Sequence, residues 1–177
     1  MLEEPELATR LVRAVHARDD LLDMLEAEEP DVIYLYCHAR SAGEGVFEPH
    51  LELCAKGKSP GRITAGDIAG KRWAHAPLVL LNGCSSVAFS PSAPSPFIQC
   101  LVRDRRASGV IGTEVTVWEA LAGEMALRFL RHFLAGTPAG HALLNARWEL
   151  LAKHNPLGLV YTLYAPAELK LARRAPS

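Results

Sequence analysis

The sequence lacks several features that would assign a protein to a class at once. It has no apolar run that approaches the roughly 18 residues of a membrane span, no signal-peptide pattern at its start and no internal repeat. Its formal net charge is −1 at pH 7, which gives no reason to expect nucleic acid as a direct partner. From these absences we expect a cytoplasmic protein with neither a membrane nor a nucleic-acid partner.

Cysteine is also scarce and irregularly spaced. Cys37, Cys54, Cys84 and Cys100 show no short paired spacing, so a disulfide framework is not expected and a reducing compartment is the default. A metal site built from Cys37, His38, Cys54 and Cys84 is an alternative, but adjacent Cys37-His38 is its sole close pair. We expect no metal and no cofactor.

What the chain does have is an alternation of strand and helix patterns. Hydrophobic residues make up 49% of its 177 positions, enough for one domain with a sizeable core. The patterns predict strands at 32–36, 78–81, 109–112 and 159–164, and helices at 20–27, 97–105, 121–133 and 138–151. Residues 39–61 are predicted as a loop with a short strand at 51–54. We expect a parallel sheet covered by helices, in a single domain over residues 1–177 with a polar, frayed tail at 166–177.

Two of the predicted strands end in residues with nucleophile chemistry. The apolar run 78–81 follows Pro77 and ends in the small polar stretch 82–86, which contains Cys84. The strand 32–36 is followed by Cys37 and then His38. If these strands are parallel neighbours, His38 and Cys84 emerge at the same sheet edge, where ligands of α/β proteins bind. This is the arrangement of a thiol nucleophile and its base. The alternative is that His38 and Cys84 are a core histidine and a buried thiol without a catalytic role, which would give the same sequence pattern.

Four stretches of the chain resemble the CHAT domain, a family of caspase-like cysteine peptidases in the same clan as caspases and separase. They are residues 30–38, 78–86, 109–114 and 155–161, and the resemblance covers roughly residues 10–165. It implies a three-layer α/β/α caspase-like fold with a mostly parallel sheet. It also implies that His38 is the catalytic histidine and Cys84 the nucleophile, with the backbone N–H groups of Ala39 and Cys84 binding the oxyanion.

The sequence departs from the family pattern in two places. Family members usually have glycine directly after the catalytic histidine, whereas this chain has Ala39, which still offers a backbone N–H. The first strand of the caspase-like sheet has no counterpart, although the pattern makes 11–16 a strand. We therefore expect the chain to be the C-terminal part of a longer protein, or a sensor domain or partner chain to cover the open sheet edge.

The resemblance also suggests a function. It implies a regulated cysteine endopeptidase that cleaves a protein substrate, in bacterial defence or controlled cell death. By the family pattern, Asn82 and the stretch 113–115 line the primary substrate pocket. Because Glu114 is the charge available there, a basic substrate residue, arginine before lysine, is expected at P1. A non-catalytic partner-binding module and a small-molecule hydrolase remain alternatives.

Overall fold

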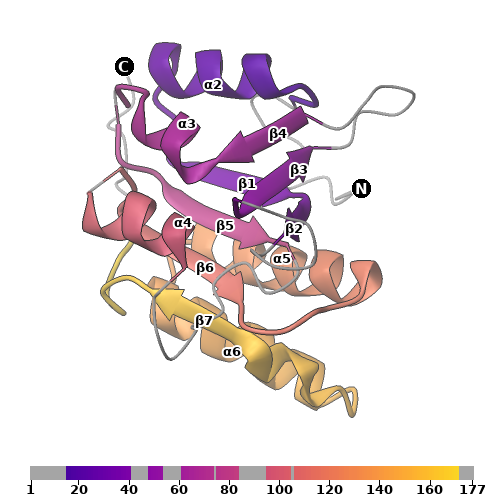
Figure 1. Cartoon of the computed structure of the whole chain (residues 1–177). Coiled ribbons are helices and arrows are strands. Elements are labelled where there is room, and N and C mark those ends of the chain that lie inside the picture. The colour runs from indigo at the N-terminus through magenta and orange to yellow at the C-terminus, as the bar shows by residue number, and fades with distance from the viewer. Residues whose placement is uncertain are drawn as a thin grey trace.

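The computed structural model describes residues 15–40, 48–53, 61–73, 75–83, 95–104 and 106–171. Within them, the central sheet has four strands in the order β1-β5-β6-β7 (Figure 1): β1 (Val32–Tyr36), β5 (Leu78–Asn82), β6 (Gly109–Thr113) and β7 (Tyr161–Tyr164). The first three are parallel, and β7 runs antiparallel to β6. The predicted, mostly parallel sheet is confirmed.

Helices cover both faces of this sheet and complete a three-layer α/β/α arrangement (Figure 1). One face carries α2 (Arg18–Ala27), α3 (Ala65–Ala69), α4 (Pro96–Ile98) and the π-helical turn η1 (Gln99–Arg103). The other face carries α5 (Glu119–Leu134), α6 (Ala139–Leu151) and the 3-10 helix η2 (Pro156–Val160).

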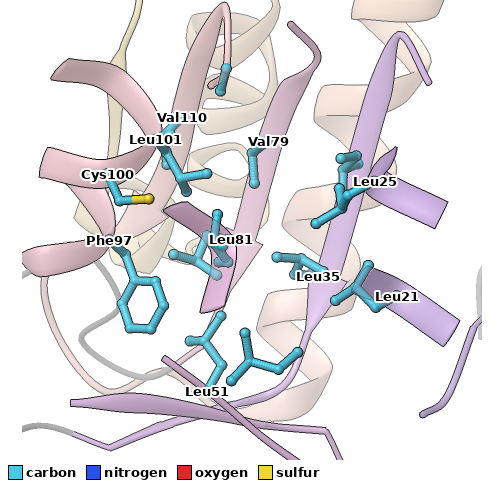
Figure 2. Close-up of a cluster of buried hydrophobic side chains, with 14 of the residues drawn as sticks. Leu21, Leu25, Leu35, Leu51, Val79, Leu81, Phe97, Cys100, Leu101 and Val110 are labelled. Carbon is cyan, nitrogen blue, oxygen red and sulfur yellow. The ribbon is translucent and has the colours of Figure 1, made fainter. Parts of the chain in front are cut away.

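The central strand β5 explains why residues 78–81 are an unbroken apolar run. Val79 and Leu81 point into one hydrophobic cluster, whereas Leu78 and Leu80 point into the other. A strand that is buried on both faces needs no polar alternation. Figure 2 shows the first cluster, in which the following side chains gather on one side of the sheet: Leu21, Leu25, Leu35, Leu51, Val79, Leu81, Phe97, Cys100, Leu101 and Val110.

The segment predicted as a loop at 39–61 contains a second sheet, so that prediction is wrong in part. The strands β2 (His38–Arg40), β3 (His50–Leu53) and β4 (Gly61–Thr64) form an antiparallel sheet in that order. Its inner face packs on the first cluster through Leu51, Leu53 and Ile63. At the end of β4, Thr64 caps α3 in a reciprocal capping box with Asp67.

Three further expectations need correction or lie outside the described residues. Residues 11–14 of the predicted strand are outside the described part, and Val15 and His16 are not in a strand. The last strand begins at Tyr161, because residues 156–160 form η2. The tail is not frayed over 166–171: the carbonyls of Ala167 and Leu169 accept hydrogen bonds from the first two N–H groups of α6. These N–H groups have no partner within the helix, so the tail satisfies them.

None of the helices in the described part of the chain is both long enough and apolar enough to cross a membrane.

Candidate active site

The carboxyl ends of β1 and β5 lie side by side, as the sequence predicted. Tyr36 at the end of β1 pairs with Asn82 at the end of β5, and the N–H of Cys37 continues the ladder by donating to the Asn82 carbonyl at 3.4 Å. His38 follows one residue later on β2, and Gly83 follows directly after β5. The two chain segments that carry the predicted dyad therefore leave the sheet at one edge.

Gly83 touches the segment around the predicted base so closely that a side chain would crowd it. A Cβ atom at Gly83 would lie 3.1 Å from the Cys37 carbonyl oxygen, 3.2 Å from the Ala39 Cβ and 3.4 Å from the Ala39 nitrogen. From β6, the hydroxyl of Thr113 donates to the Gly83 carbonyl at 2.9 Å in a buried hydrogen bond. Gly83 is thus held from two sides, with its α-carbon facing the residues that flank His38.

The two members of the predicted dyad differ in what the structure describes. His38 is the first residue of β2 and is exposed, and Ala39 behind it is half-buried against the core. Cys84 lies outside the described residues, as does Cys54. The structure therefore places the predicted base and the residue before the predicted nucleophile, and Gly83 and Ala39 approach each other closely between them.

Asn82, a predicted substrate-pocket residue, occupies a buried position between three elements. The residue is 2% exposed. Its amide nitrogen donates to the Tyr34 hydroxyl at 3.0 Å and to the Ala122 carbonyl at 2.7 Å. Its amide oxygen accepts from the Tyr161 hydroxyl at 2.8 Å. Burial raises the pKa of Tyr34, and the hydrogen bond from Asn82 only partly offsets this. The amide connects β1, α5 and β7, and these internal bonds do not test whether it also contacts substrate. That predicted contact stays a prediction.

Glu114, the other predicted pocket residue, is exposed just after β6. One carboxylate oxygen accepts a hydrogen bond from the Thr162 hydroxyl at 2.8 Å, and the Glu114 N–H donates to the Val160 carbonyl at 3.3 Å. No Lys or Arg of the described residues forms an ion pair with it. Val115 and Trp118 are exposed on the same segment. The carboxylate is therefore positioned by a neutral partner and keeps its charge available.

The polar surroundings of His38 on the small sheet escaped the sequence analysis. Glu52 of β3 is the residue directly opposite His38 in the antiparallel ladder. Its carboxylate accepts from Arg40 Nε at 3.2 Å and lies 3.4 Å from His50 Nε2. Burial works to raise the pKa of Glu52, but the hydrogen bonds from Arg40 and His50 outweigh it and lower this pKa. A charged carboxylate is thus fixed opposite the predicted base.

The remaining described cysteines have structural environments. Cys37 is half-buried and packs against the first hydrophobic cluster. Cys100 is buried on η1, its thiol donates to the Ala65 carbonyl at 3.4 Å, and burial raises its pKa. Among the described residues, no group of three or more His, Cys, Asp or Glu is placed to hold a metal ion. Since Cys54 and Cys84 fall outside them, the alternative metal site stays untested.

Comparison with known proteins gives two findings. The sequence model of the CHAT domain matches residues 1–168. A protein of Vitiosangium sp. (strain GDMCC 1.1324) that is named a probable protease is 32% identical over 169 residues. The match covers 93% of this chain but only 22% of that relative, so the chain spans about a fifth of the relative's length.

Proposed function

The chain belongs to the CHAT domain family, a protease-like family, and from this premise we propose that it is a cysteine endopeptidase with His38 as base and Cys84 as nucleophile. The observation that carries the proposal is the close approach of Gly83 to the Cys37 carbonyl and to Ala39, which a Cβ at position 83 would meet at 3.1–3.4 Å. Consecutive α-carbons are about 3.8 Å apart, so Cys84 begins one peptide unit from this contact. We propose that from there the Cys84 thiol reaches the His38 imidazole.

The proposed reaction uses these groups in order. His38 takes the thiol proton, and the Cys84 thiolate attacks the carbonyl carbon of the scissile peptide bond. The N–H groups of Ala39 and Cys84 donate to the oxyanion, which is where such donors contribute most. As the C–N bond breaks, His38 returns the proton to the leaving amine. Water, deprotonated by His38, then hydrolyses the thioester and restores the thiol.

Glu114 supports a basic P1 residue as the substrate preference. Its carboxylate is exposed at the edge that carries the dyad and is oriented by Thr162 without a neutralising cation among the described residues. Arginine matches a carboxylate with two parallel hydrogen bonds, which lysine cannot form. The test is a library of peptides that differ at P1, with Glu114→Gln beside Glu119→Gln as the control. Preference for aspartate, or a basic preference unchanged in Glu114→Gln, would assign the pocket to other residues.

The dyad itself is tested with the thiol and the imidazole separately. We expect Cys84→Ala and His38→Ala each to abolish peptide cleavage, with the double variant no worse, because residues that act as a unit are not additive. Cys100→Ala is the matched control, since its buried thiol lies away from this edge. Circular dichroism and thermal unfolding establish that each variant is folded. Near-full cleavage by folded Cys84→Ala would refute the assignment.

The outer edge of β1 supports a second role, binding a partner. No strand of the described residues pairs with this edge, and an open sheet edge invites pairing with another chain. We place a regulatory domain or partner chain there, in a cytoplasmic effector of defence or cell death. If the chain were a non-catalytic scaffold, partner binding would persist while Cys84 failed to react with a thiol-directed probe. A monomer that stays soluble at high concentration with this edge exposed to solvent would count against the partner.

A further inference from the structure

The small sheet presents a charged face, which is the face turned away from the hydrophobic core. Side chains alternate across a strand, and Ala39, Leu51 and Ile63 occupy the core side. The other side therefore carries the polar residues of the three strands: His38, Arg40, His50, Glu52, Arg62 and Thr64. Glu52 carries the carboxylate of this set, whose other titratable or charged groups are the guanidinium groups of Arg40 and Arg62 and the imidazoles of His38 and His50.

Glu52 is the charged residue that lies directly opposite His38 in the ladder. The two residues are directly opposite in the ladder, where Cβ atoms are typically about 4.5–5.5 Å apart. Arg40 is two positions along on the same strand as His38, and Arg62 belongs to the next strand beyond Glu52. The Glu52 side chain is only 15% exposed and is held by Arg40 and His50, so its position is fixed.

We propose that Glu52 is a positioning residue for His38, whose fixed negative charge stabilises the imidazolium that forms when His38 takes the proton of Cys84. This inference rests on the proposed function, because it assigns the third group of that dyad. Without Glu52, the imidazolium would share this face of the small sheet with the guanidinium groups of Arg40 and Arg62, and the carboxylate of the set would be gone. The thiolate–imidazolium pair would then form less readily, and the thiol would lose its proton at higher pH.

The experiment measures proton uptake by His38 and proton loss by the thiol. In Glu52→Gln, the carboxylate becomes a neutral amide of nearly the same shape. We expect the acid-side midpoint of Cys84 alkylation by iodoacetamide, followed by mass spectrometry, to rise by about half a pH unit. This corresponds to about threefold slower alkylation below the midpoint, an effect reduced by the solvent exposure of His38. Glu168→Gln, which removes an exposed charge at the opposite edge of the sheet, should leave the midpoint unchanged.

Two further variants distinguish a charge effect from loosening of the strands. Glu52→Asp keeps the charge and should return the midpoint toward that of the unmodified protein. Arg40→Gln removes a cation from the same face and should move the midpoint in the opposite direction to Glu52→Gln. An unchanged midpoint in folded Glu52→Gln, or shifts of the same sign in Glu52→Gln and Arg40→Gln, would overturn the inference.

A second readout separates failure of this inference from failure of the proposed function. NMR titration of the His38 ring in a Cys84→Ala background requires no catalysis, and Glu52→Gln should move its midpoint to lower pH. If alkylation of Cys84 were insensitive to His38→Ala, the dyad would be wrong, yet the ring titration would still decide whether Glu52 stabilises the imidazolium. If His38→Ala slowed alkylation of Cys84 but Glu52→Gln left the titration midpoint of the His38 ring unchanged, the dyad would stand and the role of Glu52 would be refuted.

Discussion

Replacing Asn82 with alanine tests whether its side chain connects the fold or contacts substrate. The amide makes three hydrogen bonds, to Tyr34 on β1, to the Ala122 carbonyl on α5 and to Tyr161 on β7. Asn82→Ala removes all three at once. Because Tyr161 is fully buried, its hydroxyl would be left without this partner in an apolar setting.

The expected loss of stability follows from counting these bonds. A hydrogen bond contributes about 1 kcal/mol net, and a buried group left unpaired costs about 1–3 kcal/mol. Tyr34 is half-buried and can turn to water, and the Ala122 carbonyl lies within α5, where a helix N–H group also bonds to it. The largest part of the loss therefore comes from the buried bond between Asn82 and Tyr161. We therefore expect Asn82→Ala to lower the free energy of unfolding by about 3–5 kcal/mol. Tyr161→Phe breaks one bond and should cost about 1–2 kcal/mol.

Urea unfolding followed by tryptophan fluorescence measures both variants. With a slope of about 2 kcal/mol per molar urea, a loss of about 3 kcal/mol moves the midpoint by about 1.5 M. A double-mutant cycle between Asn82 and Tyr161 should show coupling, since the two side chains share a bond. A loss below about 1 kcal/mol in Asn82→Ala, together with an altered P1 preference, would refute the connecting role and favour substrate contact.

Two further predictions concern the stability of the same fold. Burial would raise the pKa of Glu149, but its hydrogen bonds to His132, Arg128 and Arg131 outweigh it and lower the pKa from 4.5 to about 2. The stabilisation from this carboxylate is therefore present above about pH 4.5 and is lost as the pH falls toward 2. Over this range the free energy of unfolding should fall further in the unmodified protein than in Glu149→Gln, by up to about 3 kcal/mol. Gly109→Ala should lower the melting temperature through about 1–3 kcal/mol of overpacking, because its Cβ would lie 2.2 Å from the Ala165 Cβ. Gly123→Ala on α5 meets nothing within 4 Å and should not destabilise; equal effects of the two substitutions would contradict this account.

The sequence was most informative where one residue type dominates a short stretch. The apolar run 78–81 predicted a strand buried on both faces, and β5 confirms it. The order of strands and helices predicted the parallel neighbours that bring His38 and Gly83 to one edge. These features depend on local patterns, which any reader of the chain can see.

What the sequence could not show depends on pairs of distant residues. The partners of Asn82 in its hydrogen bonds with Tyr34 and Tyr161 are 48 and 79 positions away. The sequence therefore could not show that these bonds hold the Asn82 amide inside the fold, and its predicted contact with substrate stays a prediction. The small sheet was predicted only in part, for a related reason. The short strand expected at 51–54 matches β3, whereas β2 and β4 were expected to be loop because their core-facing residues are few and separated by polar and glycine positions.

The same distant pairs explain how a strand tip can carry chemistry without losing its position. Strand ends are usually mobile, because their ladder stops there. At the end of β5, the ladder is prolonged by the bond from the Cys37 N–H to the Asn82 carbonyl, and the Gly83 carbonyl is bound by Thr113. The first bond comes from the segment after β1 and the second from β6, so the end of β5 is held from both sides. Glycine at 83 favours this double attachment, since a Cβ there would lie 3.1 Å from the Cys37 carbonyl oxygen and 3.2 Å from the Ala39 Cβ, so that one of the two segments that the proposed dyad must bring together would have to shift.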